Sequence, residues 1–142
     1  MTAQQGSQRH EGFDMKVAFT LHNFYNLLSS DFGLRYKFKT QDGTAKGGTG
    51  VGFDYTPTSG TIEWKGGSKT SIIIVPTRTD GVCESDETFK LILTDSEIYY
   101  PAPRSEWVNE CETYGAYHYP CRFETEVTIV QSAQLCGGSF GE

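Results

Sequence analysis

Hydrophobic and polar residues alternate along several stretches of this chain. From residue 13 to residue 21 every second position is hydrophobic, and Leu34, Tyr36 and Phe38 alternate with basic residues. Because successive side chains of a β-strand point to opposite faces, this alternation predicts strands with one buried face. The run of β-branched residues at 72–75 predicts a strand that lies deep in the fold. Strands are therefore expected at residues 13–21, 34–39, 61–64, 69–75, 87–94 and 123–130.

Turn-forming segments separate these stretches. Gln41-Asp42-Gly43-Thr44 is typical of a turn, and residues 46–52 form a glycine-rich loop. Short alternating strands joined by such turns are typical of two antiparallel sheets that pack face to face. We therefore predict an all-β protein, an antiparallel β-sandwich.

Composition agrees with one β-rich domain. The 142 residues include 16 glycines and 37% hydrophobic residues, enough for one core. The net charge is −6, and residues 80–142 carry three Lys/Arg against twelve Asp/Glu, whereas residues 1–79 carry nine against six. A nucleic-acid partner is excluded as the main ligand because it requires a basic surface. The acidic half favours cations.

Cys83, Cys111, Cys121 and Cys136 make an even number of cysteines. In a small domain this favours up to two disulfides formed in an oxidising compartment, with three pairings available. We expect Cys111–Cys121, since closing a loop of roughly ten residues stabilises the fold by about 3 kcal/mol. Cys83–Cys136 would then follow by elimination. A zinc site with His118 is the alternative, but the Cys-x-x-Cys spacing is absent.

Residues 95–122 form an insertion before the last strand that is too long for a hairpin turn. It is rich in aromatic residues and contains both cysteines of the expected bridge. It is either a clamp over an exposed sheet edge or an interaction surface for a protein or a sugar. The residues of this predicted partner surface are Tyr99, Tyr100, Trp107, Tyr117 and Tyr119.

The two ends of the chain lack strand patterns. Residues 2–9 are polar without alternation, so the first strand of a sandwich is expected to be weak or missing. Residues 1–10 would then be flexible or paired with a partner, and a neighbouring chain or copy would supply the strand by strand addition. Residues 132–142 are expected to be a tail. No apolar stretch reaches the roughly 18 residues of a membrane helix, and no signal-peptide core precedes residue 10, so a secreted form would be a mature or excised segment.

Four linked motifs resemble the Calx-beta domain family. They are Asp-Gly-Thr-Ala at 42–45, Asp-Tyr-Thr-Pro-Thr-Ser-Gly-Thr at 54–61, a glycine pair before Lys-Thr-Ser-Ile at 69–72, and Glu-Ser-Asp-Glu-Thr-Phe at 84–89 with Asp80 before it. The resemblance covers roughly residues 11–131. It implies a seven-stranded immunoglobulin-like sandwich, found in the regulatory region of sodium–calcium exchangers and in extracellular adhesion and matrix proteins.

The resemblance also implies a calcium site. In calcium-binding members, carboxylates from loops at one end of the sandwich hold the ions, and oxygen ligands are what Ca²⁺ prefers. Two departures predict a single weak site: Thr79 precedes Asp80 where members carry successive aspartates, and 131–134 replace an Asp-rich segment. A metal-free loop whose positive charge comes from Arg78 is the alternative. The predicted ligands are Glu11, Asp42, Asp80, Glu84 and Glu87.

The Asp-Tyr-Thr-Pro motif has a structural interpretation. Pro57 restricts φ and keeps Thr56 extended. We expect the Asp54 carboxylate to accept backbone hydrogen bonds, with metal ligation as the alternative. Tyr55 is expected to fill the end of the sandwich, and Asp86 is expected to face solvent.

No catalytic motif accompanies these features. The chain has no Gly-x-Ser-x-Gly, and the glycine-rich loop lacks the Gly-Lys-Ser/Thr of a phosphate-binding loop. We predict a non-enzymatic, extracellular or cell-surface module that serves as a structural or adhesive unit of a larger assembly. The alternatives are a calcium-sensing regulatory domain and a carbohydrate-binding module that uses the aromatic insertion.

Overall fold

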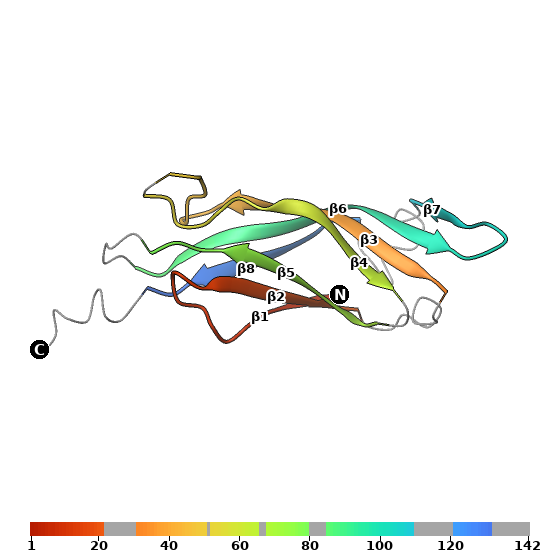
Figure 1. Cartoon of the computed structure of the whole chain (residues 1–142), viewed down its shortest axis with the longest axis horizontal. Coiled ribbons are helices and arrows are strands. Elements are labelled where there is room, and N and C mark those ends of the chain that lie inside the picture. The colour runs from red at the N-terminus through yellow and green to blue at the C-terminus, as the bar shows by residue number, and fades with distance from the viewer. Residues whose placement is uncertain (22–30, 51, 66–67, 80–84, 110–120, 132–142) are drawn as a thin grey trace, which may run out of the picture.

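The computed structural model describes residues 1–21, 31–50, 52–65, 68–79, 85–109 and 121–131. Within these ranges the chain forms two antiparallel β-sheets that pack face to face in an elongated molecule (Figure 1). The described residues contain no helix that is long and apolar enough to cross a membrane. The strands are β1 (Thr2–Gln5), β2 (Asp14–Thr20), β3 (Gly33–Asp42), β4 (Ser59–Lys65), β5 (Thr70–Pro76), β6 (Glu87–Tyr100), β7 (Glu106–Val108) and β8 (Phe123–Ile129).

Strand pairing divides the eight strands between a three-stranded and a five-stranded sheet. The smaller sheet has the order β1-β2-β5, and the larger has the order β4-β3-β6-β7, with β8 pairing β6. The 14-residue strand β6 is the centre of the larger sheet: its first half pairs with β8 and its second half with β7. The architecture is the antiparallel sandwich that the alternation predicted.

Alternating side chains of both sheets meet in one core. Met15, Val17 and Phe19 of β2 face Leu34 and Tyr36 of β3 and the buried residues of β6. The indole N–H of Trp64 on β4 donates a 3.1 Å hydrogen bond to the carbonyl of Phe19 on β2, and so joins the two sheets. Burial of these faces is the main stabilising term of the fold.

Three features differ from the sequence expectations. The described residues form eight strands where seven were expected, because β7 lies inside the predicted insertion. The first strand is present: Thr2–Gln5 pair with β2 of the same chain, so no neighbouring chain is needed to supply it. Residues 72–75 were expected to lie deep in the fold, but Ile72 and Ile74 are 57% and 47% exposed. β5 covers the core with one face only.

Candidate metal centre at the loop end of the sandwich

One end of the sandwich, at the left of Figure 1, collects the turn after β3, the exit of β5, the start of β6 and the exit of β8. The Asp-Gly-Thr-Ala turn docks on β6 there. Ala45 N–H donates to the Thr88 carbonyl at 2.8 Å, and Thr88 N–H donates to Oγ1 of Thr44 at 2.9 Å. Gly43 is required by this close approach, because a Cβ at that position would lie 2.5 Å from the Thr88 carbonyl oxygen. The turn therefore contacts Thr88, the residue that follows Glu87 in β6.

Asp42 anchors the loop that follows it. Its Oδ1 accepts hydrogen bonds from the Tyr55 hydroxyl at 2.5 Å and from the Gly47 N–H at 2.9 Å. These donors, the tyrosine first, and the charge of Lys46 hold the pKa of Asp42 below its ordinary value of 3.8. At least one oxygen of this predicted ligand is therefore engaged by the protein.

Tyr55 fills the end of the sandwich, as predicted. It is 1% exposed, and its ring stacks on Phe89 with centroids 4.3 Å apart. Burial first, and the Asp42 carboxylate second, raise the pKa of the Tyr55 phenol well above its ordinary value. The hydroxyl thus stays protonated and donates to Asp42.

The predicted role of Asp54 is confirmed. Its Oδ2 accepts a 2.7 Å hydrogen bond from the Lys46 N–H, and its own N–H donates to the Lys46 carbonyl at 2.7 Å. The Asp54 carbonyl accepts from the Arg78 N–H at 3.0 Å. Asp54 therefore ties the glycine-rich loop to the exit of β5, consistent with its expected structural role.

Two predicted ligands, Glu11 and Glu87, each lie beside the exit of β8. Glu11 is 7% exposed, and its N–H donates to the Val130 carbonyl at 2.9 Å. Glu87 lies opposite Ile129 in the β6–β8 register, and its Oε1 is buried with no hydrogen-bond partner among the described residues. Since a buried, unsatisfied carboxylate oxygen is costly, this position favours a cation.

Gln131 adds a further oxygen that the sequence did not predict. Its side-chain Oε1 is also buried without a hydrogen-bond partner in the described part of the chain. Its backbone N–H donates to Oδ1 of Asp86 at 3.2 Å, which places it beside the start of β6. Asp86 itself is exposed, as predicted. An amide oxygen is a calcium ligand type too, but a single glutamine after a strand gives no sequence signal.

The remaining predicted ligands, Asp80 and Glu84, lie outside the described residues. Among the residues that are described, no group of three or more His, Cys, Asp or Glu side chains could hold a metal ion. Arg78, the alternative source of positive charge, donates from Nη1 to the Gly50 carbonyl at 3.3 Å. The donors that are described, two carboxylates and an amide oxygen, suit a hard cation but do not complete its coordination.

Thr77 is another contact that the sequence did not reveal. Its Oγ1 accepts from the Gly12 N–H at 2.9 Å and donates to the Phe13 carbonyl at 2.6 Å. The hydroxyl therefore holds the segment after Glu11 against the exit of β5. A threonine that follows a strand is too common to predict this role.

The predicted aromatic surface lies at the opposite end of the molecule, at β7 in Figure 1. Tyr99 and Trp107 are cross-strand partners with ring centroids 5.4 Å apart. The Arg35 guanidinium lies 4.0 Å from the Trp107 ring centroid and pairs with Glu97 at 2.8 Å. The rings, with Gly33, line a cavity of about 250 Å³. Tyr117 and Tyr119 lie outside the described residues.

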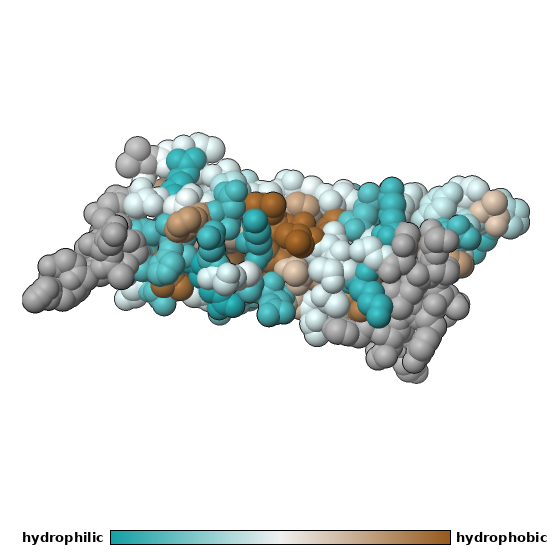
Figure 2. Space-filling model, turned by 60° about the horizontal axis from the view of Figure 1, so that its bottom comes forward, coloured by the Kyte–Doolittle hydropathy of each residue, from teal (hydrophilic) through white to brown (hydrophobic). Residues whose placement is uncertain are grey.

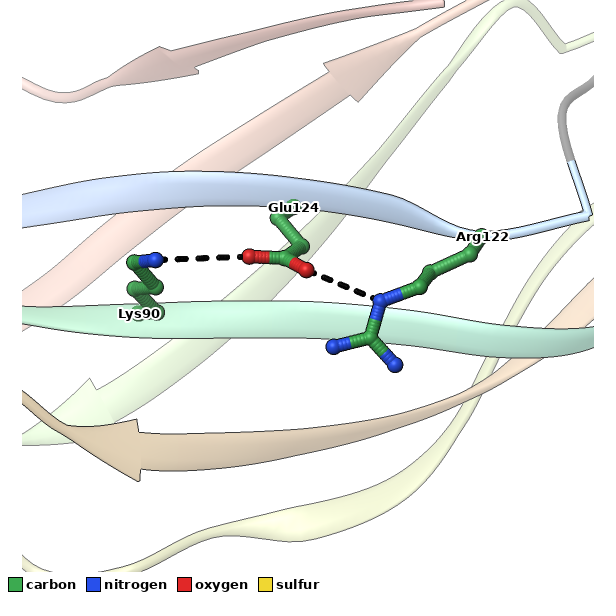
Figure 3. Close-up of polar contacts among 3 residues, drawn as sticks. All are labelled: Lys90, Arg122 and Glu124. Atoms are coloured by element: carbon green, nitrogen blue, oxygen red, sulfur yellow. Dashed lines mark hydrogen bonds and ion pairs between the residues drawn. The ribbon is translucent and has the colours of Figure 1, made fainter.

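The cations of the acidic half are paired within that half. Lys90 on β6 and Arg122 before β8 both contact Glu124, at 3.5 and 2.8 Å (Figure 3). The Arg122 hydrogen bond is the first cause of the lowered pKa of Glu124. Arg104 pairs with Glu106 at 2.9 Å. These cations are therefore engaged by glutamates away from the loop end.

Cys121 is the only cysteine among the described residues, and it is not a free thiol. Cys83, Cys111 and Cys136 lie outside the described ranges. The expected pairing of Cys111 with Cys121, and of Cys83 with Cys136, therefore stays a prediction.

The two-sheet architecture and its loop end define an immunoglobulin-like sandwich domain. A family model of the Calx-beta domain matches residues 30–108, which is more than half of the chain. The chain belongs to the Calx-beta domain family. The sequence resemblance to that family is thereby confirmed.

Solved structures of similar fold have low sequence identity to this chain. The apo form of the Calx CBD1 domain is 18% identical with a TM-score of 0.45, over 84% of this chain and 81% of that chain. The Calx CBD2 domain is 14% identical with a TM-score of 0.49, over 89% and 82%. The calcium binding domain CBD12 of CALX1.1 is 19% identical with a TM-score of 0.47, and the match spans 84% of this chain and 38% of that longer one. No curated protein matches the chain.

Proposed function

We propose that this chain is a non-enzymatic Calx-beta module that serves as a structural or adhesive unit of a larger extracellular assembly, and that one weakly bound calcium ion stiffens its loop end. The observation that carries the calcium proposal is the buried Oε1 of Glu87, which has no hydrogen-bond partner among the described residues. Glu11 and the amide oxygen of Gln131 lie beside the same strand exit. Family membership supports the same location.

In this proposal Glu11 and Glu87 are ligands, and Asp80 and Glu84 complete the set. Asp42 contributes mainly by fixing the loop, because Tyr55 and Gly47 already hold one of its oxygens. The bound ion neutralises carboxylates that would otherwise repel one another. It also joins β6 to the start of β2 and the exit of β8. The expected result is a more rigid loop end.

Thermal unfolding with millimolar CaCl₂, MgCl₂ or EDTA tests this site. Because calcium would bind only the folded state, a free calcium concentration of ten times the Kd should stabilise the protein by about 1.4 kcal/mol. Glu87→Gln should abolish the calcium-dependent rise in Tm. Glu126→Gln, the same change at an exposed position of β8, should keep it. A Tm that calcium leaves unchanged would contradict the calcium site.

The extracellular part of the proposal predicts oxidised cysteines. Peptide mapping of the protein purified under oxidising conditions should find Cys111 joined to Cys121 and Cys83 joined to Cys136. Reduction should lower the Tm, since each lost bridge removes on the order of 2–4 kcal/mol of stabilisation. Four free thiols in the protein isolated from its source would argue for the calcium-sensing regulatory alternative in a reducing compartment.

The aromatic cavity supports carbohydrate binding as a second candidate. Tyr99 and Trp107 form one wall and Lys65 lies across from them, with the backbone of Gly33 between. Aromatic faces beside a hydrogen-bonding group are suited to a sugar ring. A glycan array probed with the native chain and with Tyr99→Ala tests this candidate, and the variant should lose the glycan signals of the native chain. If the native chain gives no signal, or if the variant keeps every signal, the candidate is rejected.

A further inference from the structure

Strand β5 forms one edge of the three-stranded sheet. One side of β5 pairs with β2 over its whole length. On the other side its two ends are engaged: the Ser68 hydroxyl donates to the Thr70 carbonyl at 3.1 Å, and Thr56 N–H donates to the Pro76 carbonyl at 2.9 Å, just before Tyr55 pairs with Thr77. In the part of the chain that the structure describes, no backbone hydrogen bond reaches this side of β5 before Pro76.

Hydrogen bonds at the two ends of β5 show which of its residues face the open side. The Lys69 carbonyl accepts from the Leu21 N–H at 2.8 Å, on the β2 side, whereas the Pro76 carbonyl accepts on the opposite side. Backbone groups of a strand alternate in direction from one residue to the next. Thr70, Ile72 and Ile74 therefore direct their N–H and C=O groups to the open edge.

The open edge also carries exposed apolar side chains. Ile72 and Ile74 point away from the core and are 57% and 47% exposed. Their cross-strand neighbours on β2 are Ala18 and Lys16. The view in Figure 2, turned toward the smaller sheet, has hydrophobic residues gathered near the middle of the molecule. An exposed apolar edge of this kind promotes pairing with another strand.

Other sheet edges are protected in ways that β5 is not. β4 carries the charged Glu63 and Lys65, and β1 and β7 are only four and three residues long. The β8 edge is occupied by the side chain of Gln5, whose Nε2 donates to the Thr128 carbonyl at 2.6 Å and whose Oε1 accepts from the Thr128 N–H at 3.0 Å. Charges, short length and capping all oppose edge pairing. Residues 70–75 have no charged side chain at all.

We propose that β5 pairs antiparallel with β5 of a second copy of this chain, about a two-fold axis at Ile73. In this register Ile72 lies opposite Ile74 of the second copy, and both residues direct their backbone groups to the seam, so they exchange N–H···O=C bonds in both directions. The four isoleucine side chains form cross-strand pairs on the outer face. The strand is thus complementary to itself in hydrogen bonds, shape and lack of charge, which an isologous contact requires.

The contact is small. An edge-to-edge pair of short strands buries less than the roughly 1,200 Å² typical of stable complexes. The dimer should therefore be weak, with a Kd on the order of 0.1 mM. Calcium has no part in it, so dimerisation is expected equally in EDTA, and its failure would not bear on the proposed calcium site.

Two measurements on the native chain in EDTA test the proposal. Sedimentation velocity from about 10 µM to about 1 mM should move from monomer to dimer. Amide hydrogen exchange by NMR should slow at Ile72 and Ile74 by about fivefold at the higher concentration, where about a fifth of the chains remain monomeric, while the Ile73 amide, which faces β2, is protected throughout. Monomer at every concentration, or a dimer without added protection at Ile72 and Ile74, would overturn the proposal.

A variant pair separates edge pairing from general hydrophobic association. The double variant Ile72→Lys/Ile74→Lys replaces exposed side chains only and should stay monomeric up to about 1 mM, because lysines would then face lysines across the seam. In the control Phe13→Lys, the replaced side chain is 48% exposed but lies outside β5, so this variant should dimerise like the native chain. Dimerisation of the double variant, or its loss in Phe13→Lys, would refute pairing at β5.

Discussion

The Tyr55 hydroxyl donates a 2.5 Å hydrogen bond to Oδ1 of Asp42, and this bond joins the two family motifs at the loop end. Tyr55 is buried against Phe89 of β6, whereas Asp42 ends β3. The bond therefore fixes the glycine-rich loop between them relative to the start of β6. Glu87, the main candidate ligand, lies two residues before Phe89.

A double-mutant cycle should measure this bond. Tyr55→Phe and Asp42→Ala are each expected to lower the free energy of unfolding by about 1–2 kcal/mol, because each removes the hydrogen bond between the Tyr55 hydroxyl and the Asp42 carboxylate. The double variant should lose less than the sum of the two, since both changes remove the same interaction. Urea unfolding of the four proteins gives the coupling energy, and strict additivity would mean that the bond does not contribute to stability.

Stability should fall in acid through Asp42. Its pKa is lowered in the folded protein, so the unfolded chain takes up the proton first, near the ordinary value of 3.8. The stabilisation is fully present above that pH and is lost as the pH falls through the folded pKa. Asp42→Asn should remove this part of the decrease in unfolding free energy below about pH 4. Since Asp42 is exposed at the surface, we expect its contribution to the free energy of unfolding to be well under 1 kcal/mol. If the unfolding free energies of the native chain and Asp42→Asn ran parallel against pH, this contribution of Asp42 would be contradicted.

Gly43→Ala should destabilise the loop end. The added Cβ would lie 2.5 Å from the Thr88 carbonyl oxygen, so the turn or β6 must shift, at a cost of about 1–3 kcal/mol. Gly6→Ala is the matched control, because its Cβ would lie 3.5 Å from the nearest atom, an ordinary contact. Denaturant midpoints of the two variants provide the comparison, and equal midpoints would show that the turn is not constrained by Thr88.

Gln5→Ala should loosen the edge of β8. The variant loses both hydrogen bonds to the Thr128 backbone, so we expect about 1–2 kcal/mol of destabilisation and faster hydrogen exchange at the Thr128 amide. Gln4→Ala, one position earlier in β1 and exposed, should change neither. Unaltered exchange at Thr128 in Gln5→Ala would mean that the side chain does not protect this edge.

Most of the strands could be predicted because period-two alternation is a local property of the sequence. The strands that alternation could not predict depend on pairing. Thr2–Gln5 are polar, and they form a strand because their backbone pairs with β2 and the Gln5 side chain bonds to Thr128. β7 is a three-residue strand that pairs with the extended end of β6. A strand of this kind gains its stability from a neighbour far along the chain.

The candidate site was predictable to the extent that motifs carry it. Asp42, Asp54 and Tyr55 follow from turn chemistry at fixed spacing, and the structure brings them together. Gln131 and Thr77 act at the same end through single contacts with segments distant in sequence. No spacing rule relates such residues, so only the folded chain reveals them.

The sequence by itself therefore determined the family, the sandwich and the loop end at which the candidate oxygen ligands are expected, because alternation and turn residues act over a few positions. The tertiary structure decided which isoleucines of β5 are exposed, which sheet edges are protected, and which oxygen of Glu87 is buried without a hydrogen-bond partner among the described residues. The physical reason is that burial and hydrogen-bond satisfaction are properties of the neighbours a residue acquires on folding. Those neighbours come from segments that are remote along the chain.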